Sequence, residues 1–109
     1  MEDYVVQVTE EALSDMEAIY RYIAEKLLSP ENALGQYNRI ADEILSLQIF
    51  PERYRLVEFE PERSQGLRRM LVDSYSVFYV VREDRVIVTG VLYSASDITR
   101  RLKERRVWP

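Results

Sequence analysis

The chain of 109 residues contains no cysteine and no histidine. Without cysteine it can form neither disulfides nor thiolate metal sites, and without histidine it lacks the commonest general base and metal ligand of proteins. Catalytic triads that use histidine and zinc-binding H-E-x-x-H helices are therefore excluded. We expect no metal and no cofactor.

Long apolar runs and glycine are also scarce. The longest apolar stretches have four or five residues, whereas a membrane-spanning helix needs about 20. An acidic start, Met1–Tyr4, is unlike a signal peptide. We therefore expect a cytoplasmic protein without a membrane partner. The three glycines form no Gly-rich phosphate loop.

The composition, with 47% hydrophobic and 31% charged residues, is typical of a soluble globular protein, and the length predicts a single domain over residues 1–109. The net charge of −4 is unevenly spread. Residues 1–50 hold ten carboxylates against three cations, and residues 51–109 hold twelve cations against nine carboxylates. The basic half indicates either a face for an anionic partner or arginines scattered over a solvated surface.

Hydrophobic periodicity predicts two helices after a short strand at 4–8. Thr9 is a suitable N-cap for the first helix, and Ser29 with Pro30 begins the second. Residues spaced by three and four share one apolar face in each helix; they are Leu13, Met16, Tyr20, Ile23 and Leu27 in the first and Ala33, Tyr37, Ile40, Ile44 and Leu47 in the second. The short connection predicts an antiparallel helical hairpin.

The second half predicts strands. A charged loop at 51–66 contains a possible short strand at 55–59, and strands follow at 67–72, 75–81 and 85–93, joined by two-residue turns. The strand at 75–81 is apolar on both faces and is therefore expected to be central. Glu58, Glu60 and Glu62 are expected to be solubilising loop residues. A helix is expected to start at Asp97 and to place Ile98 and Leu102 on one face. This order indicates an α+β fold.

Four segments, taken in order, resemble the RelE/ParE superfamily of toxins from bacterial type II toxin–antitoxin systems. They are Thr9–Ala12 with Ile19–Ile23, Ile44–Leu47 with Pro51 and Tyr54, Gly66–Met70 leading to Tyr75–Val81, and Val86–Val88 with Val91–Tyr93 and Asp97. The resemblance covers nearly the whole chain. It implies the RelE-like fold, in which an antiparallel sheet packs against an N-terminal α-hairpin and a C-terminal helix follows.

The superfamily implies a toxin neutralised by a cognate antitoxin, with two possible targets. RelE-like members cleave mRNA on the ribosome and would make this chain a metal-independent endoribonuclease. The residues that would then act are Arg68, Arg69 and Tyr93 in catalysis, with Glu58 as a possible base, and Arg53, Arg55 and Arg63 at phosphates. However, Ser76 and Ser96 stand where nucleolytic relatives carry arginine. One of Arg68 and Arg69 is expected to be a solvated residue or a salt-bridge partner rather than a phosphate ligand. Tyr75 and Tyr79 are expected in the core, and Tyr93 fits either packing or catalysis.

ParE-like members instead poison DNA gyrase, and this mode is slightly favoured here because it requires a surface rather than a proton relay. Exposed aromatic residues would anchor such a contact; the candidates are Phe50, Tyr54, Phe59 and Trp108. A weakly toxic member that keeps only antitoxin binding is a further alternative. The expected assembly is a homodimer or a toxin–antitoxin hetero-oligomer.

Overall fold

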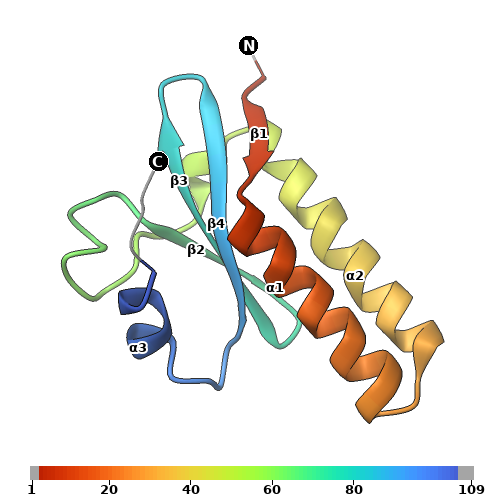
Figure 1. The fold of residues 1–109 in the computed structure, drawn as a ribbon. Coiled ribbons are helices and arrows are strands. Elements are labelled where there is room, and N and C mark those ends of the chain that lie inside the picture. Colours follow the sequence, from red (N-terminus) through yellow and green to blue (C-terminus); the bar gives the residue numbers. More distant parts are fainter. Residues whose placement is uncertain (1–2, 106–109) are drawn as a thin grey trace.

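The computed structural model describes residues 3–105 and contains a sheet between two helical layers (Figure 1). The chain runs through β1 (Val5–Val8), α1 (Glu10–Arg21), a π-helical turn (Tyr22–Lys26) and α2 (Pro30–Leu45). Two short 3₁₀ turns and a long loop lead to β2 (Arg68–Val72), β3 (Tyr75–Arg82), β4 (Arg85–Tyr93) and α3 (Ile98–Lys103). The α+β architecture predicted from the sequence is confirmed.

The sheet has the strand order β1-β4-β3-β2. The pairs β2–β3 and β3–β4 are antiparallel, as two-residue turns require, whereas β1 lies parallel to β4. The parallel pairing follows from the connection, because the chain crosses over through α1, α2 and the other two strands before β4 forms. β3 is a central strand as predicted, with residues 76–80 fully buried.

Two apolar clusters hold the layers together, one on each face of the sheet. The helical hairpin covers the first cluster, in which Ala12, Met16 and Ile40 pack against Val77 and Tyr79. α3 and the long loop cover the second cluster (Figure 1), whose members are Val57, Leu67, Phe78, Val80, Ile87, Leu92, Ile98 and Leu102. The alternation along β3 therefore sends odd-numbered side chains to the hairpin and even-numbered ones to α3.

The hairpin forms as predicted, with corrections to its details. The Thr9 side chain accepts a hydrogen bond from the Ala12 N–H, at 3.2 Å, and caps α1. Ser29 makes no side-chain cap, although Pro30 does begin α2. Leu13 and Leu27 are exposed rather than buried. Leu27 leaves the apolar face because the π-helical turn shifts the residues after Arg21 around the helix axis.

The loop before β2 also departs from the prediction. Residues 55–59 form no strand and make a single bridge between Leu56 and Arg68. The Val57 N–H donates to the Leu67 carbonyl at 2.9 Å, and the Arg69 N–H donates to the Arg55 carbonyl at 3.1 Å. The loop then leaves the sheet so that Val57 can cover the second cluster. The pairing is therefore too short to count as a strand.

Candidate functional site

A wide groove separates the far end of the helical hairpin from the sheet, and we call it the hairpin groove. Its volume is about 1140 Å³. α1 and the π-helical turn form one wall, the N-terminal half of α2 a second, and the ends of β3 and β4 a third, with Arg101 of α3 at the rim. The apolar and aromatic lining residues are Ala18, Ile19, Tyr22, Ile23, Leu27, Tyr75, Val91, Leu92 and Tyr93.

Three tyrosines from three different elements line this groove. Tyr75 of β3 and Tyr93 of β4 face each other in the sheet register, and their ring centroids lie 5.8 Å apart at an interplanar angle of 61°. Tyr22 stands in the π-helical turn and is 56% exposed. Burial raises the pKa of the Tyr75 hydroxyl, and neighbouring Tyr93 and Tyr22 raise it further. The three side chains combine apolar rings with polar hydroxyls and therefore suit a partner with mixed apolar and polar groups.

A polar network braces the α2 wall of the groove. The Asp73 carboxylate, in the turn between β2 and β3, accepts a hydrogen bond from Arg39 Nε at 2.8 Å and one from Gln36 Nε2 at 3.0 Å. Both hydrogen bonds lower the pKa of Asp73, and the bond from Arg39 has the larger effect. Asp73 itself has a φ of 53°, a left-handed conformation that aspartate tolerates better than most residues. The network links the turn between β2 and β3 to α2.

The two arginines expected at a nuclease site lie on opposite faces of β2. Arg68 lies on the hairpin side, where it donates to the Tyr54 carbonyl at 2.7 Å and approaches the Glu52 carboxylate at 3.7 Å. Arg69 lies on the α3 side and donates to Ser76 Oγ at 2.9 Å. Both side chains are half-buried, and Arg68 is a salt-bridge partner of Glu52, which is one of the two roles expected for these arginines. Their cations already serve contacts that hold the loop and the sheet.

Ser76, where the resemblance to nucleolytic relatives led us to expect an arginine, is fully buried beside Arg69. Its hydroxyl lies 2.8 Å from Ser94 Oγ while it accepts the bond from Arg69. The Arg69 guanidinium also lies 5.8 Å from the centre of the Phe78 ring. The small serine therefore leaves the space that the Arg69 side chain uses. Sequence reasoning had no signal for this bond between side chains of neighbouring strands.

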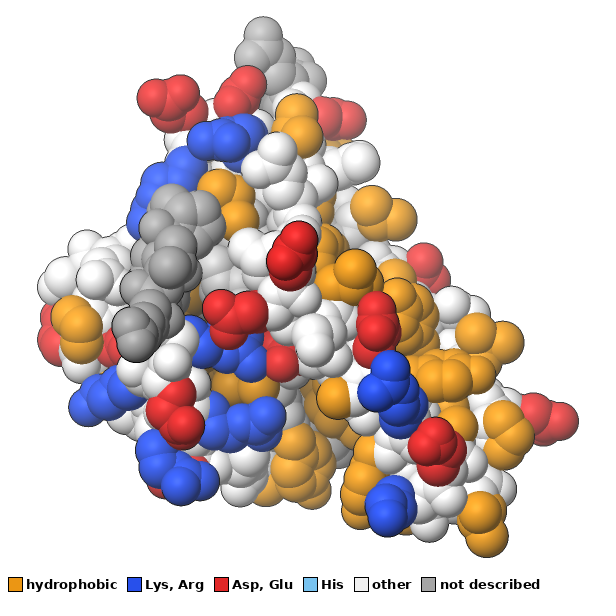
Figure 2. Space-filling view, viewed as in Figure 1, with side chains coloured by type: hydrophobic (Ala, Val, Ile, Leu, Met, Phe, Trp, Pro, Cys, Tyr) orange, Lys and Arg blue, Asp and Glu red, His pale blue; other side chains and the backbone are white. Residues whose placement is uncertain are grey.

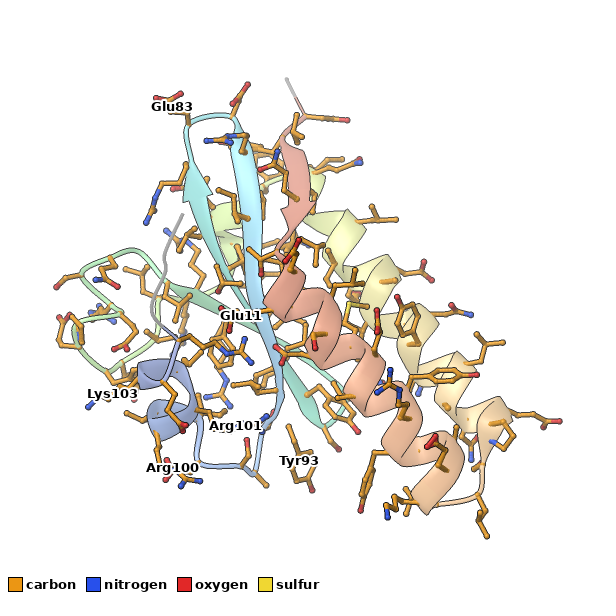
Figure 3. All side chains as sticks on the ribbon, in the orientation of Figure 1. Glu11, Glu83, Tyr93, Arg100, Arg101 and Lys103 are labelled. Atoms are coloured by element: carbon orange, nitrogen blue, oxygen red, sulfur yellow. The ribbon has the colours of Figure 1, made fainter. Side chains whose placement is uncertain are left out.

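Arg69 lies on the α3 side of the sheet, where it bonds to Ser76, whose hydroxyl lies 2.8 Å from Ser94 Oγ. Tyr93 lines the hairpin groove on the opposite face and is distant from Arg68. It pairs with Tyr75 at one end of β3, whereas Arg68 pairs with Tyr79. These two β3 positions are about 13 Å apart along the strand at roughly 3.3 Å per residue. Figure 3 shows Tyr93 at the lower end of the sheet, between α3 and the hairpin. The structure therefore does not bring Arg68, Arg69 and Tyr93 together.

The loop arginines expected at phosphates are also dispersed. Arg53 donates to the Phe50 carbonyl at 3.1 Å and to Ser46 Oγ at 2.9 Å, and its guanidinium lies 4.8 Å from the centre of the Tyr54 ring. Arg63 donates to the Val57 carbonyl at 3.1 Å, and Arg55 is exposed. Their proposed phosphate contacts remain predictions.

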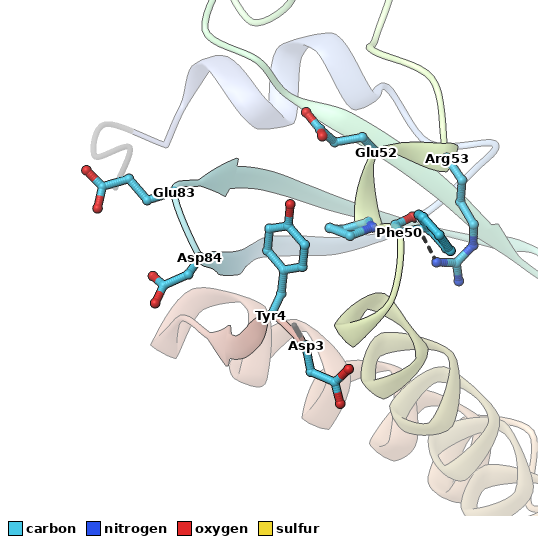
Figure 4. Close-up of a pocket in the computed structure, with 8 residues that line it drawn as sticks. Asp3, Tyr4, Phe50, Glu52, Arg53, Glu83 and Asp84 are labelled. Carbon is cyan, nitrogen blue, oxygen red and sulfur yellow. Dashed lines mark hydrogen bonds between the residues drawn. The ribbon is translucent and has the colours of Figure 1, made fainter. Parts of the chain in front are cut away.

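A second hollow, the acidic pocket, opens beside β1 with a volume of about 700 Å³ (Figure 4). Its lining includes the carboxylates of Asp3, Glu52, Glu83 and Asp84. Arg53 also lines it, but the Arg53 guanidinium bonds to the Phe50 carbonyl. The pocket therefore presents a negative field, which disfavours phosphate groups.

Exposed cations gather elsewhere, around α3 (Figure 2). Arg100, Arg101 and Lys103 are all exposed, so they are available to an anionic partner, and that contact stays a prediction. Among the aromatic candidates, Phe50 is 60% exposed, whereas Tyr54 and Phe59 are half-buried. Trp108 lies outside the described residues.

The glutamates of the loop differ from expectation in one case. Glu58 and Glu60 are exposed as expected, but Glu62 is buried and its Oε1 has no hydrogen-bond partner among the described residues. The turn folds Glu62 inward because its backbone carbonyl accepts bonds from the N–H groups of Gln65 and Leu67. Within residues 3–105 no group of three or more His, Cys, Asp or Glu side chains has metal-binding geometry.

Comparison with known protein families shows to which family this chain belongs. The model of the ParE toxin of the type II toxin–antitoxin system parDE matches residues 6–98. The chain belongs to the ParE toxin family. No curated protein sequence matches it. In the described part of this ParE-family chain, every helix is too short or too polar to cross a membrane.

Solved structures agree on the fold of this ParE-family chain. A chain of the chromosomal ParDE system from P. aeruginosa is similar with a TM-score of 0.71 at 21% identity, covering 83% of this chain and 95% of that one. A mutant of the E. coli toxin RelE in the free state has a TM-score of 0.57 at 13% identity, covering 95% and 99%. A conserved hypothetical protein from Helicobacter pylori has a TM-score of 0.50 at 11% identity, covering 85% and 97%.

Proposed function

We propose that this ParE-family chain is a cytoplasmic toxin that inhibits DNA gyrase and is neutralised by a cognate antitoxin. The observation that carries the proposal is the match of the ParE toxin model over residues 6–98. The arginine contacts support it, because Arg68 and Arg69 lie on opposite faces of β2 and bond to the protein itself. A gyrase inhibitor needs no converging acid and base, whereas RNA cleavage does.

Two assays on the purified chain separate gyrase inhibition from the RelE-like alternative. We expect DNA supercoiling by gyrase to fall as the protein is added, and mRNA on ribosomes to stay intact in a toeprinting assay. Cuts at defined codon positions with supercoiling unchanged would overturn the proposal and favour the endoribonuclease, with Arg68, Arg69 and Tyr93 as its first residues to test. Inactivity in both assays, with the antitoxin still bound, would identify a weakly toxic member.

Phe50 is the best described candidate for a contact with gyrase. It is 60% exposed, next to the Arg53 network that holds its carbonyl, so its ring is presented on a fixed backbone. We expect Phe50→Ser to weaken gyrase inhibition at least tenfold, since buried aromatic anchors dominate interface energies. Leu71→Ser, which removes a comparably exposed apolar side chain on β2, is the matched control. Equal inhibition by the two variants would exclude Phe50 from the contact.

The hairpin groove is the proposed docking site of the antitoxin. Its apolar wall and its three tyrosines suit a segment that folds on binding and inserts aliphatic side chains. We expect the product of the small neighbouring reading frame to copurify with the chain. Tyr22→Asp should weaken this complex at least tenfold, while Leu34→Asp should not, because Leu34 is similarly exposed on α2 but does not line the groove. Light scattering on the free chain and the complex would measure the assembly.

A further inference from the structure

One end of β4 extends beyond its neighbour, and two side chains take the place of the missing strand. β1 pairs with residues 85–88, but β4 continues to Tyr93. Beyond Val88, the edge of β4 therefore faces no strand in the described part of the chain. The Val91 N–H donates to Asp15 Oδ2 at 2.9 Å, and the Thr89 carbonyl accepts from Arg105 Nη1 at 3.0 Å. Asp15 and Arg105 thus supply one acceptor and one donor in place of a paired backbone.

The two side chains also bind each other. Arg105 Nη2 lies 2.7 Å from Asp15 Oδ1, and Arg105 Nε lies 3.3 Å from Glu11 Oε2. The Asp15 and Arg105 side chains are 12% and 17% exposed. This geometry separates the pair from ordinary surface ion pairs, because solvent screens a half-enclosed, hydrogen-bonded pair much less.

Gly90 makes this approach possible. A Cβ atom at Gly90 would lie 2.7 Å from Arg105 Nη1, which is too close for the two atoms to coexist. The backbone of Gly90 does not have a positive φ, so conformation alone does not require glycine here. Glycine is required because the Arg105 guanidinium passes close to the Gly90 backbone. Residues from α1, β4 and the segment after α3 therefore converge on one contact.

The segment that this contact holds has few other anchors. α3 has six residues, and an isolated helix of that length is unstable in water. Ile98 and Leu102 are its two buried side chains, and both cover the second apolar cluster over Phe78 and Leu92. Arg105 follows within one turn of Leu102. Without the Arg105 contact, α3 would be held on the sheet by the side chains of Ile98 and Leu102.

We propose that Asp15, Gly90 and Arg105 form a latch that keeps residues 98–105 closed over the sheet and closes the edge of β4. The latch also borders the hairpin groove, since Asp15 and Arg101 both line it. A partner strand that paired with β4 at residues 89–91 would need the same Val91 N–H and Thr89 carbonyl. Closure of α3 and strand addition at this edge therefore exclude each other. This inference does not depend on whether gyrase or mRNA is the target.

Hydrogen exchange of the full chain, followed by mass spectrometry, tests the latch. We expect Arg105→Gln to speed amide exchange in residues 98–105 at least tenfold while exchange in α2 and β3 stays unchanged. Gly90→Ala should have the same local effect, because its methyl group displaces the guanidinium. Arg101→Gln is the matched control. It removes an exposed cation from the same segment, and among the described residues the Arg101 side chain makes no hydrogen bond or ion pair with α1.

Three results would overturn the latch. The first is that Arg105→Gln exchanges no faster than Arg101→Gln at residues 98–105. The second is that Arg105→Gln accelerates exchange equally in α2 and β3, which would make the contact a general stabiliser. The third is that Gly90→Ala leaves residues 98–105 as protected as in the wild type. Asp15→Ala then adds a check, because it removes both carboxylate oxygens and should expose the Val91 amide together with residues 98–105.

Discussion

Replacement of Tyr79 by phenylalanine should make the stability of this protein less sensitive to alkaline pH. Tyr79 is fully buried in β3, and its hydroxyl donates a hydrogen bond to the Pro51 carbonyl. Removal of the hydroxyl leaves that carbonyl without its partner, which costs about 1 kcal/mol at pH 7. Tyr79→Phe should therefore be slightly less stable than the wild type at neutral pH.

The sign of the difference changes at high pH. Burial raises the pKa of Tyr79 from its ordinary value of 10.0 to about 12, against a smaller opposing effect of Arg68. Because the folded pKa is the higher one, the unfolded chain loses the proton first, and stability falls as pH rises from 10 towards 12. A two-unit difference corresponds to a loss of about 1.4 kcal/mol at pH 11. Tyr79→Phe has no such loss, so the advantage of the wild type should disappear near pH 11.

Urea unfolding of both proteins at pH 7, 9, 10 and 11 measures this difference. Other tyrosines and lysines ionise in both proteins, so their effects cancel in the comparison. Tyr93→Phe serves as a control at pH 7, where removal of a half-exposed hydroxyl should cost far less than 1 kcal/mol. If the free energies of unfolding of wild type and Tyr79→Phe stay parallel from pH 7 to 11, the buried hydroxyl is not the titrating group and the reasoning fails.

Three further changes test other parts of the fold. Ile40→Ala should lower the free energy of unfolding by about 2–5 kcal/mol, because Ile40 is fully buried against the sheet; a loss below 1 kcal/mol in urea unfolding would contradict the described core. Gly66→Ala should cost about 1 kcal/mol or more, since residue 66 has a φ of 88°, and an unchanged melting temperature would argue against that conformation. Asp73 has a lowered pKa through Arg39, so its stabilising effect should exist above its unfolded pKa and fade as acid titrates it. Asp73→Asn should abolish that part of the acid dependence, and identical acid unfolding curves would exclude the network.

The hydrophobic pattern was sufficient for the elements and their layers. Spacings of three and four residues identified both helices, and the doubly apolar run at 75–81 identified the central strand. These features follow from local geometry, because the period of a helix or strand is set by its own backbone. The same reasoning failed at Leu27, where a π-helical turn changes the period. It also failed at Glu62, which a turn carries inside despite its charge.

Candidate residues were harder to interpret because their partners are distant in sequence. Arg68 and Arg69 are adjacent in the chain and looked like one cationic site, yet alternation along β2 sends them to opposite faces of the sheet. The alternation can be read from the sequence, but the hydrogen-bond partners on each face of the sheet cannot. The carbonyl of Tyr54 and the hydroxyl of Ser76 reach their positions through loop and strand pairing.

By itself, the sequence determined the family, the α+β class and the absence of histidine and cysteine chemistry. The tertiary structure decided which polar groups meet, as Asp15 shows. Asp15 and Arg105 are 90 positions apart, and no spacing predicts their contact. They meet because β1 pairs in parallel with β4 and stops at Val8, which leaves the end of β4 open beside α1. Long-range contacts of this kind depend on strand order, and strand order depends on the free energy of the whole core rather than on any local pattern.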